Sequence, residues 1–128
     1  MRQTAPRLDT LSEWLFSIKP PPAIRAATDE AAVRGKALFD SAGVGCTSCH
    51  SGEKLTNNQN ATIDTVNRTK LQVPSLVAVS YRSPFMHDGC AATLAARFDP
   101  ACGGNAHGNT AGLSQDQIND LIAYLETL

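Results

Sequence analysis

The chain has 128 residues, a formal net charge of −1 and a hydrophobic share of 42%. This length suits one domain with a modest core, and with 5% aromatic residues such a core would gain much from enclosing a large cofactor. The near-neutral charge argues against nucleic acid or a membrane surface as partner, and no stretch is long and apolar enough to span a bilayer.

The first predicted element is a helix close to the N-terminus. Apolar residues recur there at helical spacing and end before the triple proline at 20–22; they are Leu8, Leu11, Trp14, Leu15 and Ile18. Consecutive prolines cannot continue a helix, so residues 20–27 are predicted to form a stiff, extended linker. We therefore divide the chain into a helix at 1–19, a proline-rich linker at 20–27 and a main domain at 28–128.

A second helix is predicted to begin near Thr28, with Thr28 as its N-cap. Asp29 and Glu30 would then lie in the first turn, where negative charge interacts favourably with the helix dipole. Gly43 and Gly45 are expected to end this helix. Its expected apolar face consists of Ala32, Val33, Ala37, Leu38 and Phe39.

The motif Cys46-Thr47-Ser48-Cys49-His50 follows this helix. The order C-x-x-C-H is typical of a c-type haem attachment site. Cys46 and Cys49 would form thioethers with the two vinyl groups of one porphyrin edge, and one helical turn would carry His50 beneath the iron as proximal ligand. A zinc ribbon would need a second C-x-x-C, and a thioredoxin-like site would need a βαβ context; the sequence has neither.

The segment from Ser51 to Val73 is polar and weakly periodic. We expect a long loop, and wrapping a cofactor edge is one role that explains such a length. The rest of the middle region is predicted as short elements: a helix or turn at 74–79, a loop at 83–89, a short helix at 93–98 and an irregular segment at 100–112.

A capping box at 114–117 begins the last predicted helix, whose apolar face is formed by Ile118, Leu121, Ile122 and Leu125. This helix is similar to the first one, because two leucines match when residues 8–18 are aligned with 118–128. Two explanations stay open. Amphipathic helices share a period and resemble one another, or residues 8–18 are the closing helix of a preceding, related domain.

The motifs of the main domain follow one another in a recognisable order: Arg34–Phe39, Gly45–Gly52, Val73–Leu76, Ser83–Gly89, Thr93-Leu94 and Leu113–Leu125. Together they span 32–128 and resemble the C-terminal, electron-transfer haem domain of the bacterial di-haem cytochrome c peroxidase superfamily. The resemblance implies an all-α, cytochrome c-like fold with long irregular loops, one covalent haem c and a periplasmic setting. It also implies that the first and last helices of the domain cross at Gly35, with Phe39 and Tyr124 packed near the crossing.

The sixth ligand of the iron distinguishes electron transfer from chemistry at an open site. The candidates are Met86, His87 and His107. The resemblance implies a distal ligand near Ala101, which cannot ligate, so this chain departs from the family pattern. We favour His107, because its flanking glycines let the backbone approach the haem face, with Met86 as the alternative. A solvated loop histidine and a gap-filling core methionine are the non-ligating interpretations.

Further residues have expected roles around the cofactor. His87 resembles the structural histidine of the family's His-Asp-Gly turn and is expected to hydrogen-bond near the haem, with an acid–base role at an open iron as the alternative. The candidates for contacts with haem propionates, which arginine suits well, are Arg68, Lys70 and Arg82; an exposed position is the competing interpretation for each.

Cys90 and Cys102 remain once the two cysteines of the haem motif are assigned. In an oxidising compartment such a leftover pair is expected to form a disulfide that closes a short loop. Two buried free thiols are the alternative.

The sequence thus predicts a single-haem c-type cytochrome module that carries electrons to or from a redox protein or an adjacent redox domain. A haem peroxidase-like enzyme domain and a gas-binding sensor, each with an open distal site, stay as alternatives. Peroxidases of the resembled family use two haems, whereas one C-x-x-C-H is present here. We expect a periplasmic or extracellular bacterial protein. Because residues 1–6 lack an apolar signal core, we expect a targeting segment upstream.

Overall fold

The computed structural model describes residues 6–62, 70–102 and 106–128. Its helices are α1 (Pro6–Ser17), α2 (Glu30–Asp40) and α3 (Gln115–Leu125), and its strands are β1 (Asn60–Thr62) and β2 (Lys70–Gln72). Single turns of 3₁₀ helix lie at Cys46–Ser48, Val79–Tyr81, Ala96–Phe98 and Pro100–Cys102. The fold is mostly helical with irregular loops, as the sequence predicted.

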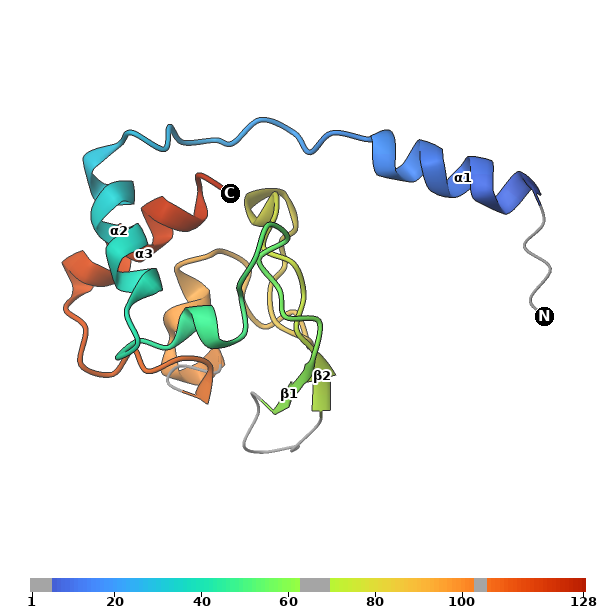
Figure 1. Cartoon of the computed structure of the whole chain (residues 1–128). Helices are drawn as coiled ribbons and strands as arrows, with labels where there is room; N and C mark the ends of the chain where they lie inside the picture. The colour runs from blue at the N-terminus through green and yellow to red at the C-terminus, as the bar shows by residue number, and fades with distance from the viewer. Residues whose placement is uncertain (1–5, 63–69, 103–105) are drawn as a thin grey trace.

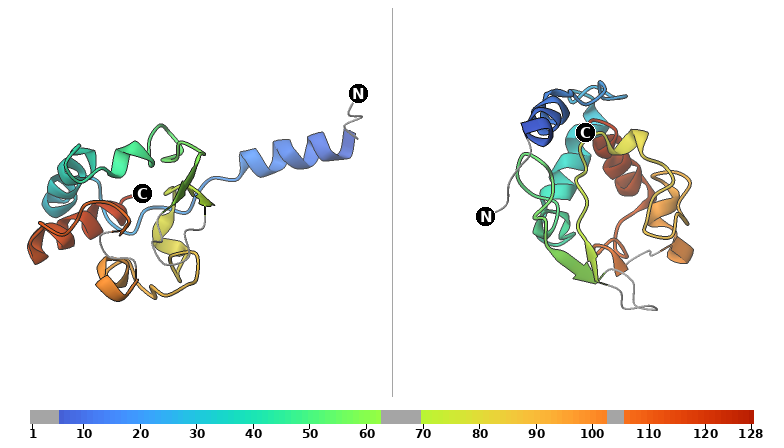
Figure 2. Two further views of the ribbon diagram at one scale, coloured as in Figure 1. Left: turned by 90° about the horizontal axis from the view of Figure 1, so that it is seen from below. Right: turned by 90° about the vertical axis from the view of Figure 1, so that its right-hand side faces the viewer.

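Helix α1 stands apart from the rest of the protein (Figure 1). An extended segment runs from it to α2, and the left-hand view of Figure 2 shows the same separation. The large apolar side chains of α1 and the residue after it are therefore exposed: Leu8, Leu11, Trp14, Leu15, Phe16 and Ile18. The linker is nevertheless fixed to the main domain, because the Tyr81 hydroxyl donates a hydrogen bond of 2.8 Å to the Pro22 carbonyl oxygen.

Helices α2 and α3 cross at Gly35. A Cβ atom at this position would lie 1.8 Å from the carbonyl oxygen of Asp120, so only glycine allows the two backbones to approach this closely. Beside the crossing, the rings of Phe39 and Tyr124 pack with their centres 5.0 Å apart. The core cluster is completed by Val79, Leu121 and Leu125. The predicted crossing is confirmed.

Two details of α2 differ from the prediction. Its N-cap is Asp29 and not Thr28, because the Asp29 carboxylate accepts hydrogen bonds from the backbone N–H groups of Ala31 and Ala32. Its buried positions are Ala32, Gly35 and Phe39. Val33 is 56% exposed and Ala37 is exposed, since the close contact at Gly35 turns the opposite side of the helix toward solvent.

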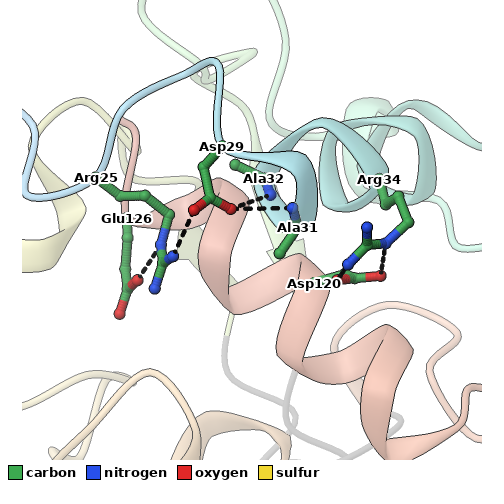
Figure 3. Close-up of polar contacts among 7 residues, drawn as sticks. All are labelled: Arg25, Asp29, Ala31, Ala32, Arg34, Asp120 and Glu126. Atoms are coloured by element: carbon green, nitrogen blue, oxygen red, sulfur yellow. Dashed lines mark hydrogen bonds and ion pairs between the residues drawn. The ribbon is translucent and has the colours of Figure 1, made fainter.

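Ion pairs hold this arrangement on the surface (Figure 3). The Arg34 guanidinium donates two hydrogen bonds, of 2.9 and 2.8 Å, to the Asp120 carboxylate, which holds the pKa of Asp120 below its usual value. Arg25 contacts Glu126 at 2.7 Å and Asp29 at 3.1 Å. The start of the domain is therefore bound to the end of α3.

The segment predicted as a loop at 51–73 contains a small hairpin. Strands β1 and β2 pair antiparallel, with Asn60 opposite Gln72. The Thr56 hydroxyl donates a 2.6 Å hydrogen bond to the Val73 carbonyl oxygen and closes the base of the segment. The short helix predicted at 93–98 is reduced to the single 3₁₀ turn Ala96–Phe98.

Candidate functional site

The C-x-x-C-H motif begins as one tight turn. Gly45 before it has a left-handed φ of 80°, a conformation that glycine adopts without steric cost. The His50 N–H then donates a 2.9 Å hydrogen bond to the Cys46 carbonyl oxygen. Cys46 and Cys49 are free, half-buried thiols. This turn brings both sulfurs and the His50 ring to one part of the structure, as attachment of a porphyrin edge requires.

The His50 side chain is buried, with 6% of its surface exposed. Its Nδ1 atom lies 3.2 Å from the carbonyl oxygen of Leu55. A hydrogen bond from Nδ1 to a backbone carbonyl fixes the orientation of the ring and leaves Nε2 as the metal-binding nitrogen. Burial lowers the pKa of His50, against the opposing effect of the Leu55 contact. The neutral imidazole is the form that binds a metal ion.

His107 lies against His50 in the folded protein. The two ring centres are 5.9 Å apart and the ring planes are inclined by 42°. A metal ion bound at about 2 Å from one nitrogen of each ring would need ring centres about 6 Å apart. The observed separation therefore fits an iron atom placed between the two imidazoles.

The surroundings of His107 also fit a metal ligand. Burial lowers its pKa to about 3, with smaller effects from the positive charges of Arg97 and His50. Among the residues that the structure describes, its buried Nδ1 atom has no hydrogen-bond partner. Burying this nitrogen without a partner is costly, so a neutral, half-buried imidazole next to a second one is consistent with a role at a bound haem.

Arg97 is a further residue of this site, and sequence reasoning missed it. Its guanidinium donates a hydrogen bond to the His107 carbonyl oxygen and stacks on the Phe98 ring, 4.6 Å from the centre. Burial lowers its pKa. The signal in the sequence was weak: an arginine followed by an aromatic residue, in the segment between Cys90 and Cys102.

Met86 and His87 occupy the loop at 83–89. The loop closes where Phe85 pairs with Ala91, and Met86 is half-buried with a φ of 69°. His87 is exposed, and the Asp88 carboxylate accepts a 3.1 Å hydrogen bond from the Cys90 N–H. A histidine on the surface is poorly placed to bind an iron that the buried His50 holds.

Two of the three propionate candidates have exposed side chains. Lys70 is exposed on β2, and Arg82 is exposed and donates a hydrogen bond to the Ser75 carbonyl oxygen. Arg68 lies outside the described residues. Cys90 and Cys102 are joined by a disulfide with their Cα atoms 5.7 Å apart, so the loop before His107 is covalently closed.

In the part of the chain that the structure describes, no helix is long and apolar enough to cross a membrane. The same residues contain no cluster of three or more His, Cys, Asp or Glu side chains that would hold a metal ion unaided. An iron held in a porphyrin needs only the axial side chains from the protein, so the pair of histidines suffices for such a centre.

Comparisons with known proteins show which proteins this chain is similar to. The family model described as "Cytochrome c" matches residues 32–128. A curated relative, "Cytochrome-c peroxidase IdrP1" from Denitromonas iodatirespirans, is 41% identical over 66 residues, which are 46% of this chain and 18% of the relative. A solved structure of Kuenenia stuttgartiensis hydrazine synthase pressurised with xenon has a similar fold, with a TM-score of 0.80 at 21% identity. That match covers 97% of this chain and 56% of the other.

Proposed function

Because the chain belongs to the cytochrome c family, we propose that it is a single-haem electron-transfer module whose iron is bound by His50 and His107. The family establishes covalent haem c as the cofactor, and Cys46 and Cys49 are the cysteines that would hold it. When bound, this cofactor exchanges single electrons between its ferric and ferrous states.

The contribution of the chain is to position two neutral imidazoles. The hydrogen bond of His50 Nδ1 to Leu55 fixes one ring, and the contact of Arg97 with the His107 carbonyl oxygen holds the backbone that carries the other. Burial around both histidines disfavours their protonated forms. Both rings are thereby kept in the state that can ligate.

The observation that carries the proposal is the 5.9 Å separation of the two ring centres. While two axial histidines are bound, the iron has no open position for peroxide or a gas, which suits electron transfer. The name of the curated relative favours a peroxidase-like enzyme as the competing function, but the chain spans 18% of that relative's length. The activity of the relative is therefore not transferred to this chain.

We further propose that the electron partner is a redox protein or an adjacent redox domain, and that the protein works in the periplasm or outside the cell, where haem attachment to C-x-x-C-H takes place. Helix α1 supports an adjacent domain. Its apolar side chains are exposed, and the similar solved chain is longer, because the match covers 97% of this chain but 56% of that one. Residues 8–18 would then pack on that domain, as their similarity to α3 suggests.

The absorption spectrum of the protein, matured in a host that attaches haem c, tests the proposal. We expect six-coordinate, low-spin spectra in the ferric and ferrous states. His107→Ala should give a high-spin ferric spectrum, and added imidazole should restore the low-spin form by occupying the vacated position.

The matched control is Met86→Leu, which removes the other candidate ligand at similar volume and should remain low-spin. A spin change in Met86→Leu but not in His107→Ala would assign the distal position to Met86. A high-spin spectrum of the unsubstituted protein would contradict the proposal and favour the enzyme or the gas sensor.

A further inference from the structure

Arg97 places a positive charge inside the haem site. Its guanidinium contacts the backbone of the distal segment at His107 and lies on the Phe98 ring. The His107 ring lies 5.9 Å, centre to centre, from the ring of His50. The cation is thus adjacent to the segment that carries the distal ligand.

The charge of Arg97 also acts on Cys46, one of the two cysteines of the C-x-x-C-H motif. Burial raises the pKa of Cys46, and the charge of Arg97 opposes that shift. An arginine side chain remains protonated in proteins, so its charge is permanent. Because Arg97 is half-buried, salt screens this charge less than it screens surface charges.

A permanent, half-buried cation has a definite effect on a redox centre. The ferric centre carries one more positive charge than the ferrous centre, so a nearby cation disfavours the ferric state through Coulomb repulsion, which is stronger in the protein interior than in water. Methionine ligation at the distal position raises the reduction potential of a haem, so a distal histidine gives a lower reduction potential than a distal methionine. A half-buried cation would offset part of that difference.

We propose that Arg97 is a positioning residue of the haem centre: it holds the distal histidine segment through the His107 carbonyl and raises the reduction potential by its charge. This rests on the proposed ligation by His50 and His107. In the reaction concerned, a reduced redox protein gives one electron to the ferric protein, which becomes ferrous while the donor is oxidised by one electron. No bond forms or breaks.

The test compares the midpoint potentials of two substitutions at this position in the haem-loaded protein. Arg97→Gln removes the charge but retains amide N–H donors, and should lower the midpoint potential while the spectrum remains low-spin. Arg97→Lys retains the charge without the planar fork of donors, and should keep a potential close to that of the unsubstituted protein.

The control is Lys36→Gln, which removes a positive charge from a side chain that is 58% exposed on α2 and should leave the potential unchanged. An Arg97→Gln variant with an unaltered potential would overturn the inference. If Arg97→Gln loses its low-spin spectrum, the midpoint potential of Arg97→Lys decides between the two outcomes. An unchanged potential in Arg97→Lys supports the inference. A lowered potential despite the retained charge contradicts it. A failure of the ligation itself is recognised separately, since the unsubstituted protein would then be high-spin.

Discussion

Gly35 in α2 lies directly against the backbone of Asp120 in α3, so that a Cβ atom at Gly35 would stand 1.8 Å from the Asp120 carbonyl oxygen. Backbone atoms cannot move aside as a flexible side chain can. Gly35→Ala should therefore push the two helices apart and lower the free energy of unfolding by about 1–3 kcal/mol or more. Urea unfolding followed by circular dichroism measures this change.

Gly112→Ala is the matched control for Gly35→Ala. A Cβ atom at Gly112 would meet no atom within 4 Å, so this substitution should leave the stability almost unchanged. Equal effects of the two substitutions would show that the helix crossing does not depend on the missing side chain.

The disulfide between Cys90 and Cys102 closes a loop at a sequence separation of 12 residues. A cross-link of this loop length restricts the unfolded chain and contributes about 3 kcal/mol in the loop-entropy account. The double substitution Cys90→Ser and Cys102→Ala should reduce the stability by a similar amount. Chemical denaturation of the oxidised protein, with and without the substitutions, provides the measurement.

Because the closed loop precedes His107, the double substitution should also lower the temperature at which the low-spin spectrum is lost on heating. Reduction of the unsubstituted protein by a thiol reagent should reproduce both effects. Identical unfolding midpoints for the oxidised protein and the double variant would contradict a stabilising role for the bridge.

The pair of Arg34 and Asp120 should make part of the stability depend on pH. The hydrogen bond from Arg34 holds the pKa of Asp120 below its usual value, so the folded state favours the ionised carboxylate. Such a group contributes stability above the unfolded-state pKa, about 3.9, and that contribution is lost as the pH falls through the lower, folded-state pKa.

A double-mutant cycle with Arg34→Gln and Asp120→Asn isolates this pair. Urea unfolding should reveal a favourable coupling at pH 7 that disappears in strong acid. It should also weaken at high salt, because 59% of the Arg34 side chain is exposed. A coupling of equal size in strong acid would mean that the contact does not depend on the charge of Asp120.

Removal of residues 1–19 should leave the unfolding temperature and the haem spectrum of the domain unchanged, since the apolar side chains of α1 are exposed and the helix stands apart (Figure 1). Differential scanning calorimetry provides the comparison. In the untruncated chain the single tryptophan, Trp14, is 60% exposed and should fluoresce like an indole in water. A clearly lower unfolding temperature after truncation would show that α1 packs on the domain.

The elements with strong local signals were predictable. The capping box of α3 forms as predicted, with the Ser114 side chain accepting from the Gln117 N–H and the Gln117 side chain accepting from the Ser114 N–H. The N-cap of α2 was placed one residue early, because Thr28 and Asp29 are both suitable caps and only the folded backbone selects between them. The C-x-x-C-H motif and the leftover cysteines likewise needed no tertiary information.

Features that depend on distant contacts could not be predicted. Strands β1 and β2 have three residues each, too few for the alternation that identifies a strand from sequence. The contact of Arg97 with the His107 carbonyl oxygen joins residues ten positions apart in irregular segments, which the sequence pattern does not indicate. His107 was favoured from its flanking glycines, and its contact with His50 required the whole fold to be seen.

The extended linker is held at two points on the domain: the Pro22 carbonyl by Tyr81, and Arg25 by Glu126. Four residues, two of them prolines, separate the first anchor from α1, and consecutive prolines form a semi-rigid spacer. A redox domain packed on α1 would thus be tethered within a short reach of the haem-binding domain. The rate of electron exchange between the two domains would then depend on an effective concentration that the length and stiffness of the linker set. This rate would be largely independent of the protein concentration.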